Sequence, residues 1–110
     1  MAVFTLDNIV HTYVTDTSNA TFEVVAAPGA GKRLAITRLL VSNDAAATAV
    51  KTLELKSDTT VKSKVSFNKT ELFDFGDQPL LLDENDAFDL TKGTAGDEIY
   101  ATVWYKTITV

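Results

Sequence analysis

The side chains best suited to chemistry lie in one acidic turn, Asp83-Glu84-Asn85-Asp86, with Asp89 just beyond it. Closely spaced carboxylate and amide oxygens are the ligands that Ca²⁺ prefers in proteins. The ligand spacing and the glycine of an EF-hand loop are missing, however. Because Asp and Asn are also common turn formers, the sequence favours a solvated turn ahead of a strand, with a calcium site as the alternative.

Other candidate catalytic groups are dispersed along the chain. Asp74, Asp77, Asp97 and Glu98 could supply the two carboxylates of a glycosidase, but the sequence singles out no pair. His11 is the single histidine and cysteine is absent, whereas catalytic triads, thiol catalysis and most zinc sites need these residues in combination. We therefore expect no catalytic residue, no cofactor and no metal site, and we interpret His11 as a spacer or a subunit contact.

The segment from Ala26 to Arg33 superficially resembles a phosphate-binding loop. Such a loop needs a glycine where Ala26 stands and Ser or Thr where Arg33 stands, and it opens a helix whose amides face the phosphates. A strand-like run follows Lys32 instead. The sequence therefore predicts a turn in which Gly29 and Gly31 permit positive φ.

Charge and hydropathy narrow the range of partners. The net charge is −5 and the pI is near 4.6, whereas nucleic-acid binding normally needs a basic patch. We interpret the local basic stretch as a solvated sheet face whose lysines guard an edge; it consists of Lys51, Lys56, Lys62, Lys64 and Lys69. No apolar run approaches the ~18 residues of a transmembrane helix, and no signal-peptide pattern opens the chain. We expect no nucleic-acid partner, no membrane partner, and synthesis in the cytoplasm.

Short runs of alternating apolar and polar residues, separated by turn residues, make up most of the chain. We predict strands over residues 9–15, 21–26, 32–42, 49–56, 61–67, 72–75, 80–82, 87–91 and 98–109, a weak strand over 3–6, and at most one helical turn at 45–47. Eight or nine strands in 110 residues predict a single antiparallel β-sandwich domain over residues 1–110, best described as a jelly roll. An immunoglobulin-like order is the alternative, although its Cys–Trp–Cys pattern is absent.

The last of these strands carries large apolar side chains on both faces. Ile99, Val103 and Tyr105 share one face, and Tyr100, Trp104, Ile108 and Val110 share the other. A strand with one solvated face should alternate apolar with polar residues. We therefore predict a central strand with one face in the core. The other face would meet a second layer, another chain, or a sugar ring stacked on its aromatic residues.

Five stretches taken together resemble the small all-β structural proteins of tailed bacteriophages. They are residues 31–43, 53–56, 79–82, 85–90 and 99–105, which include a strand opening with Gly-Lys, a strand opening with Pro-Leu, and a final strand rich in valine and tyrosine. The acidic turn at 83–86 is a departure, because such proteins more often have glycine there. The resemblance implies a jelly roll or related sandwich on the virion surface.

For function, the resemblance implies a capsid decoration (cement) protein without enzymatic activity, which binds the outer surface of the major capsid protein shell, often as a homotrimer. The residues expected at a subunit or capsid interface are Tyr100, Trp104, Ile108, Val110, Val3 and Phe4, and residues 1–8 would form an arm along the shell. One alternative is a carbohydrate- or receptor-binding module of a phage head or tail fibre. A small β enzyme is the other.

Overall fold

The computed structural model describes residues 8–14, 18, 20–43, 50–93 and 98–110. Within these residues every regular element is a strand. The strands are β1 (Asn8–Val14), β2 (Thr21–Val25), β3 (Lys32–Asn43), β4 (Lys51–Ser57), β5 (Thr60–Phe67), β6 (Thr70–Asp74), β7 (Leu80–Leu81), β8 (Phe88–Lys92) and β9 (Ile99–Thr109). Each overlaps a predicted strand. The strand expected over 3–6 and the helical turn expected at 45–47 lie outside the described residues.

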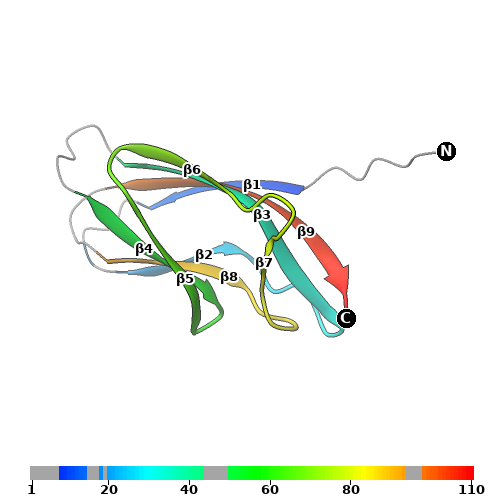
Figure 1. Cartoon of the computed structure of the whole chain (residues 1–110). Coiled ribbons are helices and arrows are strands. Elements are labelled where there is room, and N and C mark those ends of the chain that lie inside the picture. Colours follow the sequence, from blue (N-terminus) through cyan, green and yellow to red (C-terminus); the bar gives the residue numbers. More distant parts are fainter. Residues whose placement is uncertain (1–7, 15–17, 19, 44–49, 94–97) are drawn as a thin grey trace.

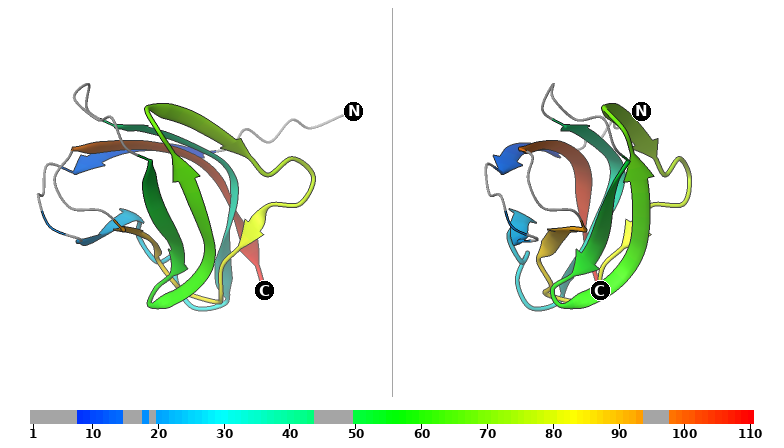
Figure 2. Two further views of the ribbon diagram at one scale, coloured as in Figure 1. Left: turned by 60° about the vertical axis from the view of Figure 1, so that its left-hand side comes forward. Right: turned by 90° about the vertical axis from the view of Figure 1, so that its left-hand side faces the viewer.

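The strands form two sheets that pack face to face, seen as an upper and a lower layer in Figure 1 and from two further sides in Figure 2. Sheet A has the order β1-β9-β3-β6, and the short β7 also pairs with β3. Sheet B has the order β2-β8-β4-β5. All pairings between the described strands are antiparallel. The predicted all-β antiparallel sandwich is therefore confirmed.

The hydrophobic core lies between the sheets and is built from the inward-facing side chains of both. Sheet A contributes Leu34, Ile36, Leu39, Val41, Ile99, Ala101 and Val103; sheet B contributes Val24, Val25, Leu53, Leu55, Phe67, Phe88 and Leu90. Burial of these apolar side chains is the main driving force for folding. Because side chains alternate along a strand, each sheet also presents an outer face, and these two faces are the broad surfaces of the molecule.

Side chains at both even-numbered and odd-numbered positions of strand β3 face the core. Leu34 and Ile36 face the core before Thr37, and Leu39 and Val41 face it afterwards. The switch is a β-bulge at Thr37, where the pairing with β9 shifts by one residue. The two-sided apolar pattern of this strand therefore results from a shift in register within the strand.

Two lysines are buried, and one of them, Lys51, belongs to the basic stretch that we expected to be solvated. Lys51 is buried because it faces inward from β4 with Leu53, and the prediction that it lies on a solvated face is wrong. Lys92 on β8 is completely buried and follows Leu90 at the same parity. Both lysines make interactions in the structure, as buried charges must. Lys62 is exposed, as expected.

The run Leu80-Leu81-Leu82 does not form a fully buried strand. Leu82 is buried, but the side chain of Leu81 is 44% exposed. Only two residues of this run pair with β3, opposite Ala35 and Ile36. Successive side chains of such a strand point to opposite faces, and Leu81 therefore faces out. An apolar run alone did not distinguish this case from a buried strand.

Candidate interaction face

Strand β9 is central in sheet A, as the sequence predicts, because it lies between β1 and β3. Its odd-numbered residues, such as Ile99 and Val103, are buried in the core. Its even-numbered residues Tyr100 and Trp104 are half-buried on the opposite side, and Ile108 is exposed. Among the described elements, none lies over this outer side (Figure 1). The second apolar face of the final strand is thus real and faces outward.

Aromatic and cationic side chains pair across the strands on this outer side. Tyr13 of β1 stands opposite Tyr100, and their rings stack with centroids 5.2 Å apart and planes at 24°. Trp104 stands opposite Ile9 of β1. The guanidinium carbon of Arg38 on β3 lies 5.3 Å from the centre of the Trp104 ring, a cation–π contact. These contacts hold the aromatic rings in place on the sheet.

Aliphatic side chains extend the same surface toward β6 and β7. Leu40 of β3 pairs with Leu72 of β6, whose side chain is 51% exposed. Ile9 is 61% exposed and Ile108 40%. We call the outward apolar side chains of sheet A the apolar face; its members are Ile9, Tyr13, Leu40, Leu72, Leu81, Tyr100, Trp104 and Ile108. Contiguous exposed apolar surface of this kind marks an interaction site more often than chance exposure does.

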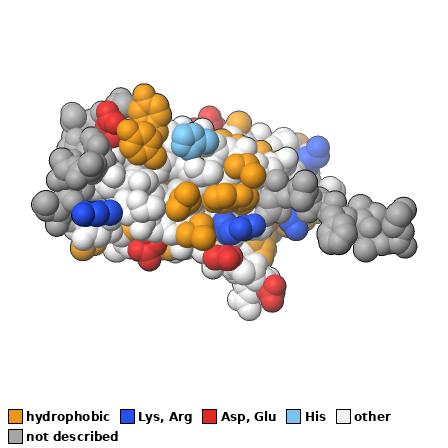
Figure 3. All heavy atoms as spheres, turned by 90° about the horizontal axis from the view of Figure 1, so that it is seen from above, with side chains coloured by type: hydrophobic (Ala, Val, Ile, Leu, Met, Phe, Trp, Pro, Cys, Tyr) orange, Lys and Arg blue, Asp and Glu red, His pale blue; other side chains and the backbone are white. Residues whose placement is uncertain are grey.

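Figure 3 views the apolar face from above. Hydrophobic side chains gather around the histidine and over the middle of the face, whereas the acidic side chains lie toward its margins. His11 stands opposite Thr102 of β9 and is exposed. The single histidine is therefore part of this outer surface. Its proposed role as a subunit contact stays a prediction.

The outer face of sheet B has the opposite character. Most of its cross-strand neighbours are polar or charged, as in the row Glu23–Asp89–Lys56, although the exposed Val61 stands opposite Lys56. The Nζ atom of Lys64 lies 3.5 Å from Oε2 of Glu54. Exposed pairs of this kind contribute little to stability but keep a surface well solvated. The molecule thus has one broad face suited to water and one suited to contact with a partner.

Asp89 is the titratable group most affected by its surroundings on sheet B. Partial burial raises the pKa of its carboxyl above the ordinary value, and the carboxylates of Glu23 and Asp58 raise this pKa further, while Lys56 opposes them. One of its oxygens, Oδ1, is buried without a hydrogen-bond partner. The ionised carboxylate is therefore poorly accommodated in the folded state.

The acidic turn that was a candidate calcium site binds the protein's own backbone. Oδ1 of Asn85 accepts a hydrogen bond from the Gly29 amide at 2.9 Å, and Oε2 of Glu84 accepts one from the Gly31 amide at 3.0 Å. Gly29 and Gly31 have φ of 109° and 77°, as the predicted turn requires. The glycine turn that resembled a phosphate loop therefore gives these two amides to side chains of the acidic turn. The backbone N–H of Asn85 in turn donates to the backbone carbonyl of Lys32 at 2.7 Å.

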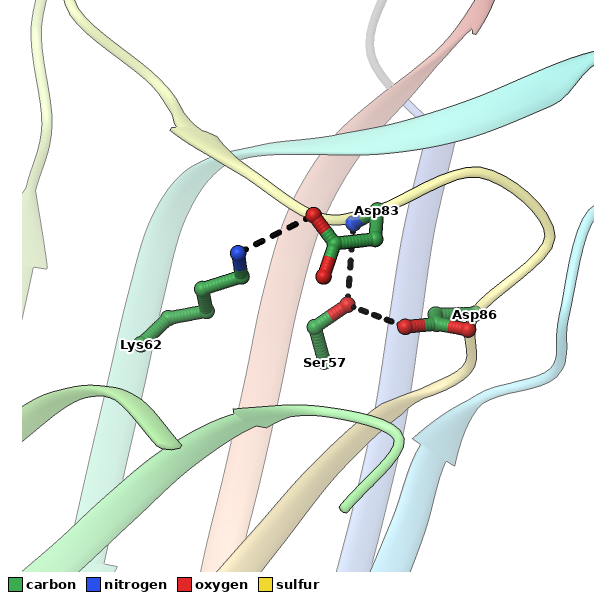
Figure 4. A network of polar contacts seen from close by, with 4 residues as sticks. All are labelled: Ser57, Lys62, Asp83 and Asp86. Atoms are coloured by element: carbon green, nitrogen blue, oxygen red, sulfur yellow. Dashed lines mark hydrogen bonds and ion pairs between the residues drawn. The ribbon is translucent and has the colours of Figure 1, made fainter. Parts of the chain in front are cut away.

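Ser57 anchors the other side of the same acidic turn (Figure 4). Its hydroxyl donates to Oδ2 of Asp86 at 2.7 Å and accepts from the Asp83 amide at 2.9 Å. The Nζ atom of Lys62 contacts Oδ1 of Asp83 at 3.0 Å. Within the described residues, no group of three or more His, Asp or Glu side chains is placed to hold a metal ion. The turn is thus a structural junction between β5, β8 and the end of β4.

Two of the remaining candidate carboxylates, Asp74 and Glu98, make local hydrogen bonds. Asp74 lies at the end of β6, where Oδ1 accepts from the Gly76 amide at 2.9 Å. Glu98 lies before β9 and accepts a hydrogen bond from the Tyr100 hydroxyl at 2.8 Å. Asp97 lies outside the described residues. These contacts account for Asp74 and Glu98 in structural terms.

The structure places the predicted interface residues as follows. Tyr100, Trp104 and Ile108 belong to the apolar face, and Val110 is exposed just beyond β9. Val3 and Phe4 lie outside the described residues. The sequence reasoning missed Leu72 on β6, because nothing local shows that this strand lies beside β3. Ile9 and Tyr13 were also missed, although the sequence placed them on the same face of their strand as His11.

No helix in the described part of the chain is long and apolar enough to cross a membrane. No protein-family model matches the sequence, and no curated protein matches it. Among solved structures, the fold is similar to that of a chain from the "Acidic stable capsid structure of Helicobacter pylori bacteriophage KHP30". The TM-score is 0.63 at 12% sequence identity, over 98% of this chain and 95% of that chain. The resemblance to phage structural proteins is thus confirmed at the level of the fold.

Proposed function

We propose that the protein is a decoration (cement) protein of a bacteriophage capsid, which binds the outer surface of the major capsid protein shell and stabilises it. In this role it is a non-enzymatic virion component, located on the capsid surface. The observation that carries the proposal is the apolar face of sheet A, which lies opposite the charged outer face of sheet B. One face would contact the shell or a neighbouring copy while the other faces solvent.

The similarity to a capsid chain supports a virion role. It extends over nearly the whole length of both chains, and the chain in that capsid is therefore also a small sandwich without a large additional domain. A small rigid sandwich suits attachment across several shell subunits, because modest contacts to each subunit add up to tight binding.

The strand order supports the interpretation of the sandwich as a jelly roll. With the two-residue β7 set aside, the remaining eight strands form two four-stranded antiparallel sheets, β1-β9-β3-β6 and β2-β8-β4-β5. Eight strands in two such sheets with Greek-key connections define the jelly roll. We propose a homotrimer in which the apolar face and the end of β9 contribute to the contacts.

A carbohydrate- or receptor-binding role in a phage head or tail fibre is the second candidate. It is favoured by one observation, the exposure of the Tyr13 ring in its stack with Tyr100, because aromatic faces also suit sugar rings. Replacement of Tyr100 by Ala separates the two functions. Loss of glycan binding in a folded variant would support the second candidate, and retained shell binding in the same variant would exclude this ring as the shell contact.

Co-sedimentation tests the decoration role directly. The purified protein is mixed with capsids of its source from which this protein has been stripped, and the pellet is quantified over a range of concentrations. Saturable binding at a fixed ratio to the major capsid protein is the expected result, and that ratio would indicate the symmetry axis occupied. Absence of binding by folded protein at high concentration would contradict the proposal.

A further inference from the structure

Arg38 is an exposed cation within the apolar face of sheet A. It has an even number, like Leu34 and Ile36, which face the core, but the bulge at Thr37 turns it to the outer side. The Thr37 hydroxyl donates a hydrogen bond to the Trp104 carbonyl at 3.0 Å and so ties the bulge to β9. The bulge therefore brings Arg38 and Trp104 side by side on the outer face.

The guanidinium of Arg38 is turned toward Trp104 and away from the acid on its other side. Its Cζ atom lies 5.3 Å from the centre of the Trp104 ring. Asp74 of β6 stands opposite Arg38, but among the described residues no ion pair joins the two. Oδ1 of Asp74 accepts a hydrogen bond from the Gly76 amide at 2.9 Å instead. A guanidinium stacked on an aromatic ring still presents its planar fork of N–H donors, which matches a carboxylate.

We propose that Arg38 binds a carboxylate of the shell protein when the apolar face docks. The inference rests on the proposed function and names the group that the shell presents to this face. Docking removes the face from water, and a buried charge opposes binding unless it is paired. Leu40 and Leu72 form the next cross-strand pair beside Arg38 and Asp74. These apolar neighbours exclude water from the contact, and a hydrogen bond is stronger where water is excluded.

Two other cations lie on the same side of sheet A, and their settings differ from that of Arg38. Arg33 stands opposite Ile108, and Lys106 stands opposite Ala35. Lys106 already makes an interaction within the structure. Arg38 is stacked on an aromatic ring, and tryptophan, tyrosine and arginine are the residues that most often dominate the energetics of interfaces. The partner surface is therefore apolar, with one Asp or Glu placed to meet Arg38.

Variants of Arg38 and Asp74 test the inference by co-sedimentation with stripped capsids. Arg38→Gln should weaken binding about tenfold or more, because it removes both the charge and the fork of donors. Asp74→Asn should strengthen binding about two- to fivefold, since it removes a negative charge beside the incoming carboxylate. The Asn side chain can still accept from the Gly76 amide. Lys64→Gln on sheet B removes the same charge from an exposed site and should bind like the parent.

The dependence on salt separates this charge contact from a structural role of Arg38. Binding of the parent should weaken as the NaCl concentration rises, and binding of Arg38→Gln should change much less. Urea denaturation checks that each variant is as stable as the parent.

Equal binding by Arg38→Gln and the parent would overturn the inference. Equal losses in Arg38→Gln and Lys64→Gln would also overturn it and indicate a general attraction between charges. Weaker binding by Asp74→Asn would overturn it too, because it would assign the contact to a cation of the shell. Saturable binding of the parent is the separate readout for the proposed function, which therefore stands if only the role of Arg38 fails.

Discussion

Ser57 holds the junction between the acidic turn and the end of β4 with one hydroxyl. The group is buried, donates to Asp86 and accepts from the Asp83 amide. Replacement by Ala removes both hydrogen bonds, one of them to the half-buried Asp86 carboxylate, and a hydrogen bond to a charged group contributes about 1.5–3 kcal/mol. We expect Ser57→Ala to lower the free energy of unfolding by about 2 kcal/mol, measured by urea denaturation.

The exposed Thr59, in the turn that follows β4, provides the control for this variant. Thr59→Ala should change the free energy of unfolding by no more than about 0.5 kcal/mol, as is usual for surface positions. If both variants lose stability equally, the cause lies in the hairpin turn and the role assigned to the Ser57 hydroxyl is wrong.

Asp89 gives the protein a pH-dependent contribution to stability. Its pKa is higher in the folded state than in the unfolded chain. The folded protein therefore holds the proton more tightly, and the stabilising contribution is complete below the unfolded pKa and is lost as the pH rises through the folded pKa. Asp89→Asn should remove this dependence. We expect the variant to be more stable than the parent at pH 7 and equally stable near pH 3, below the pKa of the unfolded chain, by urea denaturation across that range.

A variant that is destabilised at pH 7 would show that the ionised carboxylate makes a favourable contact. Glu23→Gln is the matched comparison, because its carboxylate faces Asp89 across the sheet and raises the same pKa. It should reduce the pH dependence without abolishing it.

At the scale of the element, the contrast between the outer faces of the two sheets predicts which face contacts the shell. Ile9 and Leu72 are exposed on sheet A, and Val61 is similarly exposed on β5 of sheet B. We expect the double variant Ile9→Thr/Leu72→Thr to weaken binding to stripped capsids about tenfold or more, which corresponds to about 1.4 kcal/mol. Val61→Thr should bind like the parent. Circular dichroism confirms that both variants are folded, and the reverse order of effects would assign the contact to sheet B.

The strands themselves were predictable because each has a recognisable local sequence pattern. Alternating residues and intervening turn residues suffice to locate a strand, and all nine described strands overlap predicted ones. Parity along one strand also identified the second apolar face of β9. Strand neighbours were not predictable in the same way, since the position of Leu72 beside Leu40 depends on a pairing between distant parts of the chain.

The lysines show a different limit of the sequence reasoning. Lys51 shares its parity with Leu53 and Leu55, and Lys92 shares its parity with Phe88 and Leu90. Alternation alone therefore indicated that both face inward. For Lys51, the expectation that a charged residue stays in water outweighed that signal. Both are buried where their strands end, and burial of a lysine depends on partners that no local pattern displays.

At the scale of the whole molecule, a decoration protein and its shell should stabilise one another. A partner that binds only the folded state raises the apparent stability by an amount that grows with its concentration relative to Kd. We expect stripped capsids to withstand higher temperature when the protein is added back, with the effect saturating at the binding stoichiometry. Differential scanning calorimetry of the particles measures the shift. The Ile9→Thr/Leu72→Thr variant at the same concentration should give little or no shift, and a full shift with that variant would contradict a role for the apolar face.

The bulge at Thr37 limits how this protein can change in length. Even-numbered positions of β3 face the core before this residue, and odd-numbered positions face it afterwards. A substitution along the strand alters one contact, but the deletion of one residue on either side of Thr37 would reverse the alternation and turn core side chains such as Leu34 or Val41 outward; only the loss of the bulge residue itself would leave both sets of core side chains facing inward. Insertions and deletions in related chains should therefore collect in the connections and avoid β3. Related proteins would then keep the number of residues in β3 even after its sequence has diverged.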